Sequence, residues 1–321
     1  MGKNIKNTSH KNHFIPVFYL NGFLQEDKRL NVFNTITGHS FKNTPNNIAY
    51  EKDLYRIERD NIEEDAQERA FGKFEGLAAS VIKKINEEKT IPLGEEYNIL
   101  IEFIALMFSR VPTMIKQASR PVSEITRNVL AIILTNEYRY NTIINRMKED
   151  GVELGGSSSY KAMKEFYESG KFTIEETQNS KVASIIKRIE MIKPFLFERN
   201  WSMILTDDAY DGFICSDNPV ALISLEELPP LCGPGFGMMN TEVTMPLSKH
   251  IALIGRFEKS PKIGVATEHT VATINSRTAM YATRLYYGAD DFVFIRKDRS
   301  IGRKKDLIQD MNEMNVTKDN I

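Results

Sequence analysis

The sequence predicts an α+β protein, in which a central helical bundle packs against a mostly antiparallel C-terminal sheet and a short N-terminal β piece. Three observations predict this class. Apolar residues recur at helical spacing through the middle of the chain. After residue 200 the period changes, and short β-rich runs bounded by Asp, Asn, Gly and Pro follow one another. Helices in one part of a chain and strands in another are typical of α+β proteins.

The N-terminal part begins with a polar segment, residues 1–12, followed by an apolar run from His13 to Phe23. The stretch from Arg29 to Asn34 alternates polar and apolar side chains, as a half-exposed strand does. We therefore expect residues 13–36 to form a short β piece that belongs with the sheet.

A helical lobe is expected at about residues 58–195. Its best-patterned helix carries apolar residues at helical spacing from Ala66 to Ile85. A second helix, 95–114, is apolar on almost every side and should therefore be central, with Pro112 kinking or stopping it because proline lacks the backbone donor. Three further helices are expected near 123–148, 160–169 and 174–192, the last closed by Pro194.

The sheet lobe is completed by about residues 200–300, with one helix near 270–286. Residues 13–300 are expected to form a single domain, and the charged residues 301–321 a tail. The segment 151–159, rich in glycine and serine, is expected to be a connector. The strand-like runs are 201–205, 212–215, 220–223, 241–247, 250–256 and 291–296.

Composition excludes several classes of protein. The 321 residues include 42 Lys and Arg against 43 Asp and Glu, so a nucleic acid or nucleotide would need a local patch. Two cysteines are too few for a disulfide scaffold, and a reducing, cytoplasmic location is expected. The apolar run from Ile99 to Phe108 is shorter than the roughly 20 residues that cross a bilayer, so we expect no membrane span.

Three glutamates of the first long helix share one face. Glu64, Glu68 and Glu75 are offset so that they lie within roughly 40° of one another on a helix. Their stripe borders the apolar arc, which places these carboxylates at the rim of the core. A solvated acidic face is the competing interpretation.

Arg110 ends the most apolar helix, where an unpaired buried charge would cost several kcal/mol. A carboxylate partner is therefore expected. Glu102, Glu68 and Glu75 are the candidates. The arginine either forms a structural salt bridge between two helices or contacts a substrate phosphate.

Two more polar residues lie where functional groups are common. Asp217 belongs to the turn Ser216-Asp217-Asn218-Pro219 between two strand-like runs, which suits a catalytic acid and is also a common turn. His13 adjoins a dense apolar run, so its ring should be held rigidly, either as a base or ligand or as a hydrogen-bonded edge of the core.

Several segments together resemble one family, the domain-of-unknown-function family numbered 4238. The run His13-Phe14-Ile15-Pro16-Val17-Phe18-Tyr19-Leu20 is similar to its N-terminal signature, and Ser216-Asp217-Asn218-Pro219-Val220 to a second run. The resemblance covers residues 13–288. Members are similar to bacterial accessory proteins associated with mobile elements and phage defence. The resemblance implies that signature positions of the family line a shared cleft; here they are His13, Glu68, Glu75, Arg110 and Asp217.

The first functional hypothesis is a metal-dependent hydrolase, specifically a nuclease that acts on a phosphate-containing substrate. Glu68, Glu75 and Asp217 would supply oxygen ligands to Mg²⁺ or Mn²⁺. His13 would be the general acid or base, and Arg110 would neutralise a phosphate.

The second hypothesis is a non-catalytic binding or regulatory protein. In it the same polar residues form a buried network that ties the helical centre to the sheet, with His13 and Arg110 satisfied by the glutamates. The loop near Ser157 or the loop near Gly235 would meet a protein partner or a second copy. The sequence leaves both hypotheses open.

Overall fold

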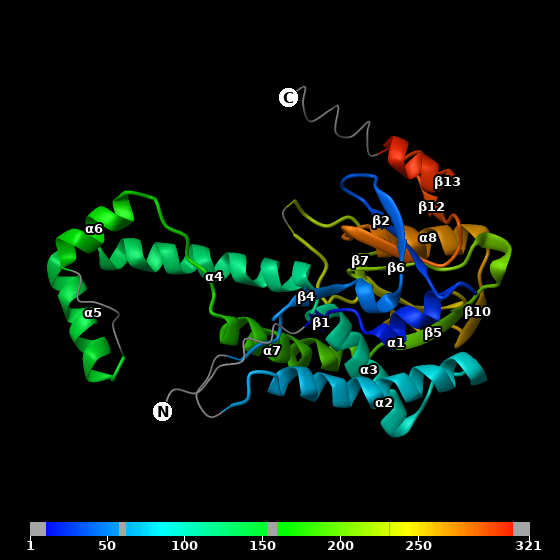
Figure 1. Cartoon of the computed structure of the whole chain (residues 1–321), viewed down its shortest axis with the longest axis horizontal. Helices are drawn as coiled ribbons and strands as arrows, with labels where there is room; N and C mark the ends of the chain where they lie inside the picture. The colour runs from blue at the N-terminus through cyan, green and yellow to red at the C-terminus, as the bar shows by residue number, and fades with distance from the viewer. Residues whose placement is uncertain (1–10, 58–61, 153–158, 231, 311–321) are drawn as a thin grey trace.

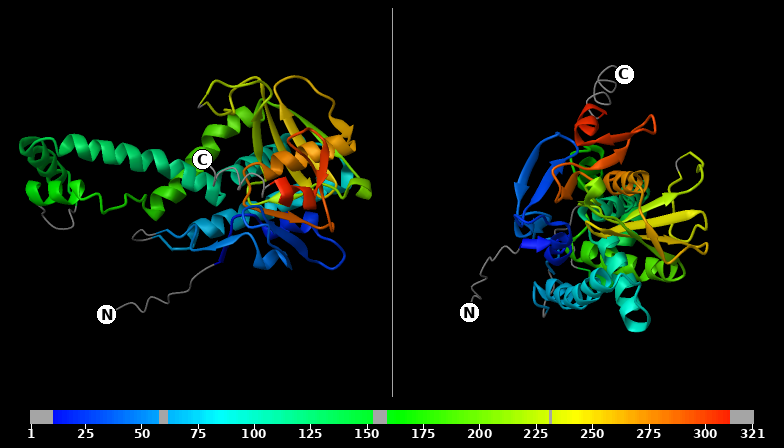
Figure 2. Two further views of the ribbon diagram at one scale, coloured as in Figure 1. Left: turned by 90° about the horizontal axis from the view of Figure 1, so that it is seen from above. Right: turned by 90° about the vertical axis from the view of Figure 1, so that its right-hand side faces the viewer.

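The computed structural model describes residues 11–57, 62–152, 159–230 and 232–310. It confirms an α+β architecture, in which sheets and helices form a body and three helices extend from it as an arm (Figures 1 and 2). The helices are α1 Val17–Leu20, α2 Ala66–Glu88, α3 Gly94–Ser109, α4 Pro112–Ile133, α5 Glu137–Glu149, α6 Tyr160–Glu168, α7 Gln178–Phe197 and α8 Glu268–Ala279. We call α4, α5 and α6 the arm.

Two larger sheets make up most of the β structure. One has the strand order β10-β5-β9-β8-β7 and the other β3-β2-β11-β6, while β1 pairs with β4 and β12 with β13. Every pairing is antiparallel except that of β10 with β5. The strands are β1 Lys11–His13, β2 Leu30–Asn34, β3 Ser40–Asn43, β4 Tyr50–Lys52, β5 Asn200–Leu205, β6 Cys215–Ser216, β7 Ala221–Ser224, β8 Thr241–Ser248, β9 Ile251–Arg256, β10 Ile263–Val265, β11 Arg284–Tyr287, β12 Val293–Ile295 and β13 Ile301–Arg303.

Residues distant in sequence share one sheet, as the sequence analysis expected of the N-terminal β piece. In the four-stranded sheet β2 pairs with β11, which places Val32 opposite Tyr286. The six predicted strand runs all contain or overlap observed strands, and the run from Arg29 to Asn34 contains β2. The strands β1, β3, β4, β10, β11 and β13 were not predicted.

The core joins the helical and sheet parts of the chain. Its largest cluster contains Tyr19 of α1, Phe103 and Ile104 of α3, and Met203 and Leu253 of the five-stranded sheet. Helix α3 is buried along most of its length, as its nearly uniform apolar composition predicted. The helical and sheet parts therefore share one continuous hydrophobic core.

The helix boundaries at the arm differ from those expected. Pro112 stops α3 as predicted, but it also begins α4, because the first turn of a helix does not need the missing N–H. The helix predicted at 123–148 is two helices: α4 ends at Ile133, and the Asn136 side chain caps α5 by accepting from the Arg139 N–H at 2.8 Å. Pro194 lies inside α7 and does not close it.

The N-terminal apolar run is helical where a β piece was expected. Pro16 fixes the entry to α1, and its carbonyl accepts from the N–H groups of Tyr19 and Leu20, each at 3.1 Å. Within the expected 13–36 piece, therefore, only His13 and β2 lie in strands. The helix expected at 270–286 is also shorter, because β11 occupies its last part.

Ordered structure extends past both expected boundaries of the domain. Lys11 and Asn12 belong to β1, and β13 pairs with β12 beyond residue 300. Arg296 and Asp310 form an ion pair at 2.5 Å, which holds the helical residues 304–310 against the β12–β13 hairpin. The rest of the expected terminal segments and residues 153–158 of the connector, with Ser157, lie outside the described residues.

No single helix of the described residues is long and apolar enough to cross a membrane. Helices α3 and α4 reach the necessary length and composition only as a pair, bent by 63°.

Candidate functional site

Arg110 is the centre of a buried polar network, which we call the Arg110 network. The residue caps the C-terminus of α3, and its side chain is completely buried. Its Nη1 lies 2.6 Å from Glu75 Oε1, while its Nε and Nη2 donate to the carbonyl oxygens of Phe14 at 2.8 Å and His13 at 3.0 Å. The guanidinium therefore ties α2 and α3 to β1 and the segment that follows it.

Glu75 keeps the buried Arg110 charged. Burial by itself would lower the pKa of the guanidinium, but the neighbouring Tyr55 and the Glu75 carboxylate outweigh it, and the pKa is raised. The Tyr55 hydroxyl also donates to the Arg110 carbonyl at 3.4 Å. Glu75 was one of three partners proposed from the sequence; Glu102 instead binds Lys193 at 2.5 Å.

His13 joins the Arg110 network through its backbone. Its ring is half-buried beside Tyr50, with the ring centroids 5.6 Å apart. Burial lowers the pKa of the imidazole, against the opposing effect of the Asn46 carbonyl, so the ring is neutral at pH 7. Its Nε2 is buried and has no hydrogen-bond partner among the described residues.

Glu68 lies near the Arg110 network. It lines a crevice of only about 10 Å³ together with Asn12, Tyr55 and Arg56. Its charge acts on both Arg110 and Tyr55. Glu68 and Glu75 are partly buried on α2, at the rim of the core, as predicted. Glu64, the third member of the predicted stripe, lies before α2, is exposed and pairs with Arg56 at 2.9 Å.

Asp217 holds two strands of the four-stranded sheet together. Its Oδ1 accepts from the Thr283 N–H at 2.9 Å, its Oδ2 accepts from the Thr283 hydroxyl, and its own N–H donates to the Arg284 carbonyl at 3.0 Å. The residue is buried, and burial raises the pKa of the carboxyl although these hydrogen bonds act against it.

The proposed metal ligands therefore do not converge. Glu75 on α2 pairs with Arg110, whereas Asp217, which follows β6, accepts from the Thr283 N–H. In the described parts of the chain no group of three or more His, Cys, Asp or Glu side chains could hold a metal ion. A chelate of Mg²⁺ or Mn²⁺ by Glu68, Glu75 and Asp217 would require a different arrangement from this one.

The sequence analysis missed a second buried ion cluster, which we call the Glu242 cluster. Glu242 on β8 is fully buried and pairs with the guanidinium groups of Arg256 on β9 and Arg277 on α8. Burial lowers the pKa of Arg277 despite this partner. A glutamate within the otherwise uncharged strand run 241–247 was the available signal.

Arg199 anchors the glycine-rich loop near Gly235. Its guanidinium donates to the carbonyl oxygens of Phe236 at 2.7 Å and Thr241 at 2.8 Å, and burial lowers its pKa to about 10. The Phe236 ring is buried and packs edge-on against Phe108, with centroids 4.8 Å apart. The loop is thus held to the core at its centre, which the sequence did not indicate.

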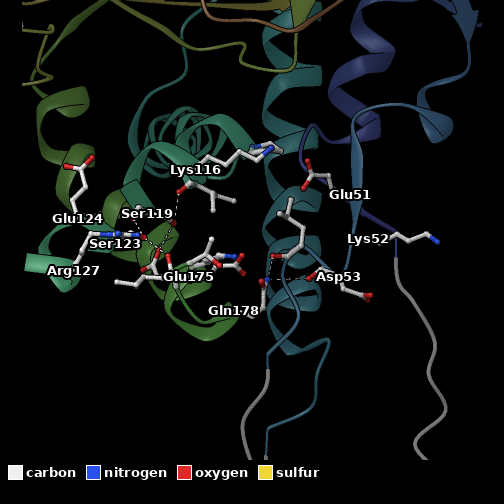
Figure 3. Close-up of a pocket in the computed structure, with 17 residues that line it drawn as sticks. Glu51, Lys52, Asp53, Lys116, Ser119, Ser123, Glu124, Arg127, Glu175 and Gln178 are labelled. Carbon is white, nitrogen blue, oxygen red and sulfur yellow. Dashed lines mark hydrogen bonds between the residues drawn. The ribbon is translucent and has the colours of Figure 1, made fainter. Parts of the chain in front are cut away.

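A cleft of about 740 Å³ lies at the root of the arm, where three segments meet (Figure 3). They are residues 51–54 around the end of β4, residues 112–127 of α4, and the segment 173–181 that enters α7. Leu54, Pro112, Ile115 and Ile174 supply apolar surface. Charged side chains of both signs surround it: Lys52, Lys116, Arg127 and Lys181 against Glu51, Asp53, Glu124, Glu175 and Glu176.

Hydrogen bonds fix the walls of this cleft to one another. The Ser119 hydroxyl donates to Glu176 at 2.6 Å, and the Ser123 hydroxyl donates to the Ile174 carbonyl at 2.9 Å. Gln178 donates to the Leu54 carbonyl at 2.6 Å. The segments that line the cleft are therefore held to one another by hydrogen bonds, and each of the three contributes side chains to it (Figure 3).

The Arg110 network sets the position of that cleft. Arg110 is followed directly by Val111 and by Pro112, which begins α4 and lines the cleft. Tyr55, which bonds to the Arg110 carbonyl, follows Leu54 on the opposite wall. Two walls of the cleft are thus joined through the hydrogen bond from the Tyr55 hydroxyl to the Arg110 backbone carbonyl.

The fold and this site define an α+β protein with a helical arm and a cleft of mixed charge at its root. The chain belongs to a family described as protein of unknown function, DUF4238, whose model it matches over residues 11–292. This confirms the resemblance of the opening and Ser-Asp-Asn-Pro runs. No curated protein and no solved structure matches the chain.

Proposed function

We propose that this protein is a non-catalytic binding protein that holds a segment of a partner protein in the cleft at the root of the arm. One observation carries the proposal: the signature side chains of Arg110, Glu75 and Asp217 bond to other parts of the chain instead of facing an open site. Such residues act by holding the walls of the cleft and the sheet in place.

The cleft suits a peptide segment better than a nucleic acid. Its volume falls in the range of about 300–1,000 Å³ that is usual for ligand sites. Four cationic and five anionic side chains line it, which would repel a polyanion but can pair with the mixed charges of a peptide. The apolar residues between them can take an apolar side chain of the bound segment.

Selection of peptides tests this proposal. A random twelve-residue display library is panned on the whole protein, and binding of the enriched peptide is measured by fluorescence anisotropy. The cleft variant carries Lys116→Glu and Lys181→Glu, whose ammonium groups form no ion pair in the described part of the chain. It should bind at least about tenfold more weakly. The matched control carries Lys259→Glu and Lys297→Glu, two exposed lysines far from the cleft, and should bind normally.

Two outcomes would overturn the proposal. One is that no peptide is enriched on the native protein relative to the cleft variant. The other is that Mg²⁺ or Mn²⁺ raises the melting temperature and supports cleavage of a nucleic acid, with cleavage abolished by Asp217→Asn. That result would instead support the metal-dependent hydrolase, with Asp217 as one of its ligands.

A further inference from the structure

Helix α4 presents two unlike faces. Thr126 and Leu130 lie half-buried on the side that faces α6 and the segment before α7, where they line a small cavity with Phe172. A second side, centred roughly 100° around the helix from the first, exposes four aliphatic side chains, each between 44% and 61% exposed. These are Val122, Ile125, Val129 and Ile132, and we call them the outer stripe.

The outer stripe is continuous and uncharged. At 100° per residue its four members fall within an arc of about 80° and span about 15 Å of the helix axis. The residues that flank them on the same side, Ala118, Pro121 and Asn128, are also uncharged. The charged residues Lys116, Glu124 and Arg127 lie on another side of α4, where they line the cleft.

Solvent-facing helices usually carry polar residues outward, so a stripe of this kind marks a contact surface. The spacing of three, four and three residues is that of a coiled-coil seam, whose partner is another helix. The stripe lies on the arm, which extends away from the body (Figures 1 and 2).

We propose that the outer stripe binds the same stripe of a second copy of this chain, with the two α4 helices antiparallel. The spacing reads the same in both directions, so a two-fold axis at the level of residue 127 sets Val122 opposite Ile132 and Ile125 opposite Val129. Every contact across the interface then pairs a valine with an isoleucine, so all layers of the interface have the same side-chain volume. A parallel pair would set valine on valine and isoleucine on isoleucine.

The charge distribution also favours a second copy. In a two-fold interface any charge near the axis meets its own copy, and this face carries none. A membrane-surface helix would show aromatic side chains on the apolar face, and the outer stripe has none. The two stripes with their neighbours bury on the order of 1,000 Å², near the lower limit for a specific interface. The dimer should therefore dissociate on dilution and leave both clefts open.

Sedimentation of the whole protein tests the interface. The native protein should change from monomer to dimer as its concentration rises through the micromolar range. The variant Ile125→Asp/Val129→Asp should stay monomeric with an unchanged melting temperature, because both side chains are already exposed. The control Leu77→Asp/Leu93→Asp alters two exposed leucines elsewhere and should dimerise normally.

Cysteine cross-linking tests the orientation, in a background where the exposed Cys232 is serine. The double variant Val122→Cys/Ile132→Cys should form disulfide-linked dimers. Val122→Cys alone should not, because antiparallel packing holds the two copies of that residue about 15 Å apart along the axis. Efficient cross-linking of the single variant would overturn the antiparallel arrangement.

A native protein that is monomeric at all concentrations would overturn the interface, as would a dimer that survives Ile125→Asp/Val129→Asp. So would stripe-dependent co-sedimentation of a monomer with phosphatidylglycerol vesicles, which would assign the stripe to a lipid surface. The cleft variant Lys116→Glu/Lys181→Glu should still dimerise, so failure of the cleft proposal is distinguishable from failure of this one.

Discussion

The two buried ion clusters differ in the sign of the central charge and in the number of its partners. In the Arg110 network one buried cation has one carboxylate partner, Glu75, and completes its hydrogen bonds with two backbone carbonyls. In the Glu242 cluster one buried anion has two guanidinium partners, Arg256 and Arg277. The first arrangement has a single paired carboxylate, whereas the second has two paired guanidinium groups for one carboxylate. We infer that sensitivity to mutation follows the number of countercharges more than the depth of burial.

The largest effect is expected from Glu75→Ala. It removes the carboxylate that is paired with the fully buried guanidinium of Arg110, and breaking such a buried pair costs about 3–5 kcal/mol of unfolding free energy. Urea unfolding measures the change. The control Glu87→Ala removes a carboxylate of the same helix whose ion pair with Lys83 is exposed, and it should cost less than about 1 kcal/mol. A similar small loss for Glu75→Ala would mean that Arg110 does not depend on one countercharge.

A smaller effect is expected when the Glu242 cluster loses one arginine. Arg277→Ala should cost about 1–3 kcal/mol and Arg256→Ala less, because the Arg256 side chain is 40% exposed and each variant leaves Glu242 one partner. The double variant should cost more than the sum of the two, since it leaves the buried carboxylate without either partner. If the losses of unfolding free energy were additive in a double-mutant cycle, neither arginine would compensate for the loss of the other.

The smallest effect is a pH dependence that comes from His13. The pKa of this imidazole is lowered in the folded protein, so below about pH 6.5 the unfolded chain binds more protons than the folded one. Stability should therefore fall as the pH drops from 7.5 to 5.5. His13→Phe should reduce this loss of stability at low pH. Between pH 7.5 and 8.5 the stability of both proteins should be independent of pH. Parallel curves for the two proteins across the whole range would contradict a buried neutral imidazole.

Side-chain patterns predicted the local features of this protein well. The nearly uniform apolar composition of α3 predicted its burial, and the spacing of Glu68 and Glu75 predicted that both lie partly buried on α2. The need of Arg110 for a carboxylate followed from the cost of a buried charge, and Glu75 was among the partners considered. Pro194 was misjudged because tertiary packing can hold a proline within a helix that local preference would end.

Contacts between distant segments were harder to predict. His13 contributes a backbone carbonyl, and every residue has one, so no side-chain signal could identify that role. Asp217 was correctly placed in a turn, but its partner Thr283 lies in the bend between α8 and β11, where the sequence analysis predicted helix. The cleft combines residues 51–54, 112–127 and 173–181, none of which is a motif by itself.

The sequence by itself determined the α+β class, the helices and strands with strong periodicity, and the family to which the chain belongs. Those properties depend on residues within a few turns of one another or on short runs. Tertiary structure alone decided which carboxylate meets Arg110, that Asp217 lies apart from Glu68 and Glu75, and where the cleft opens. The physical reason is that these contacts join elements far apart in the chain, and their choice rests on packing of the whole core.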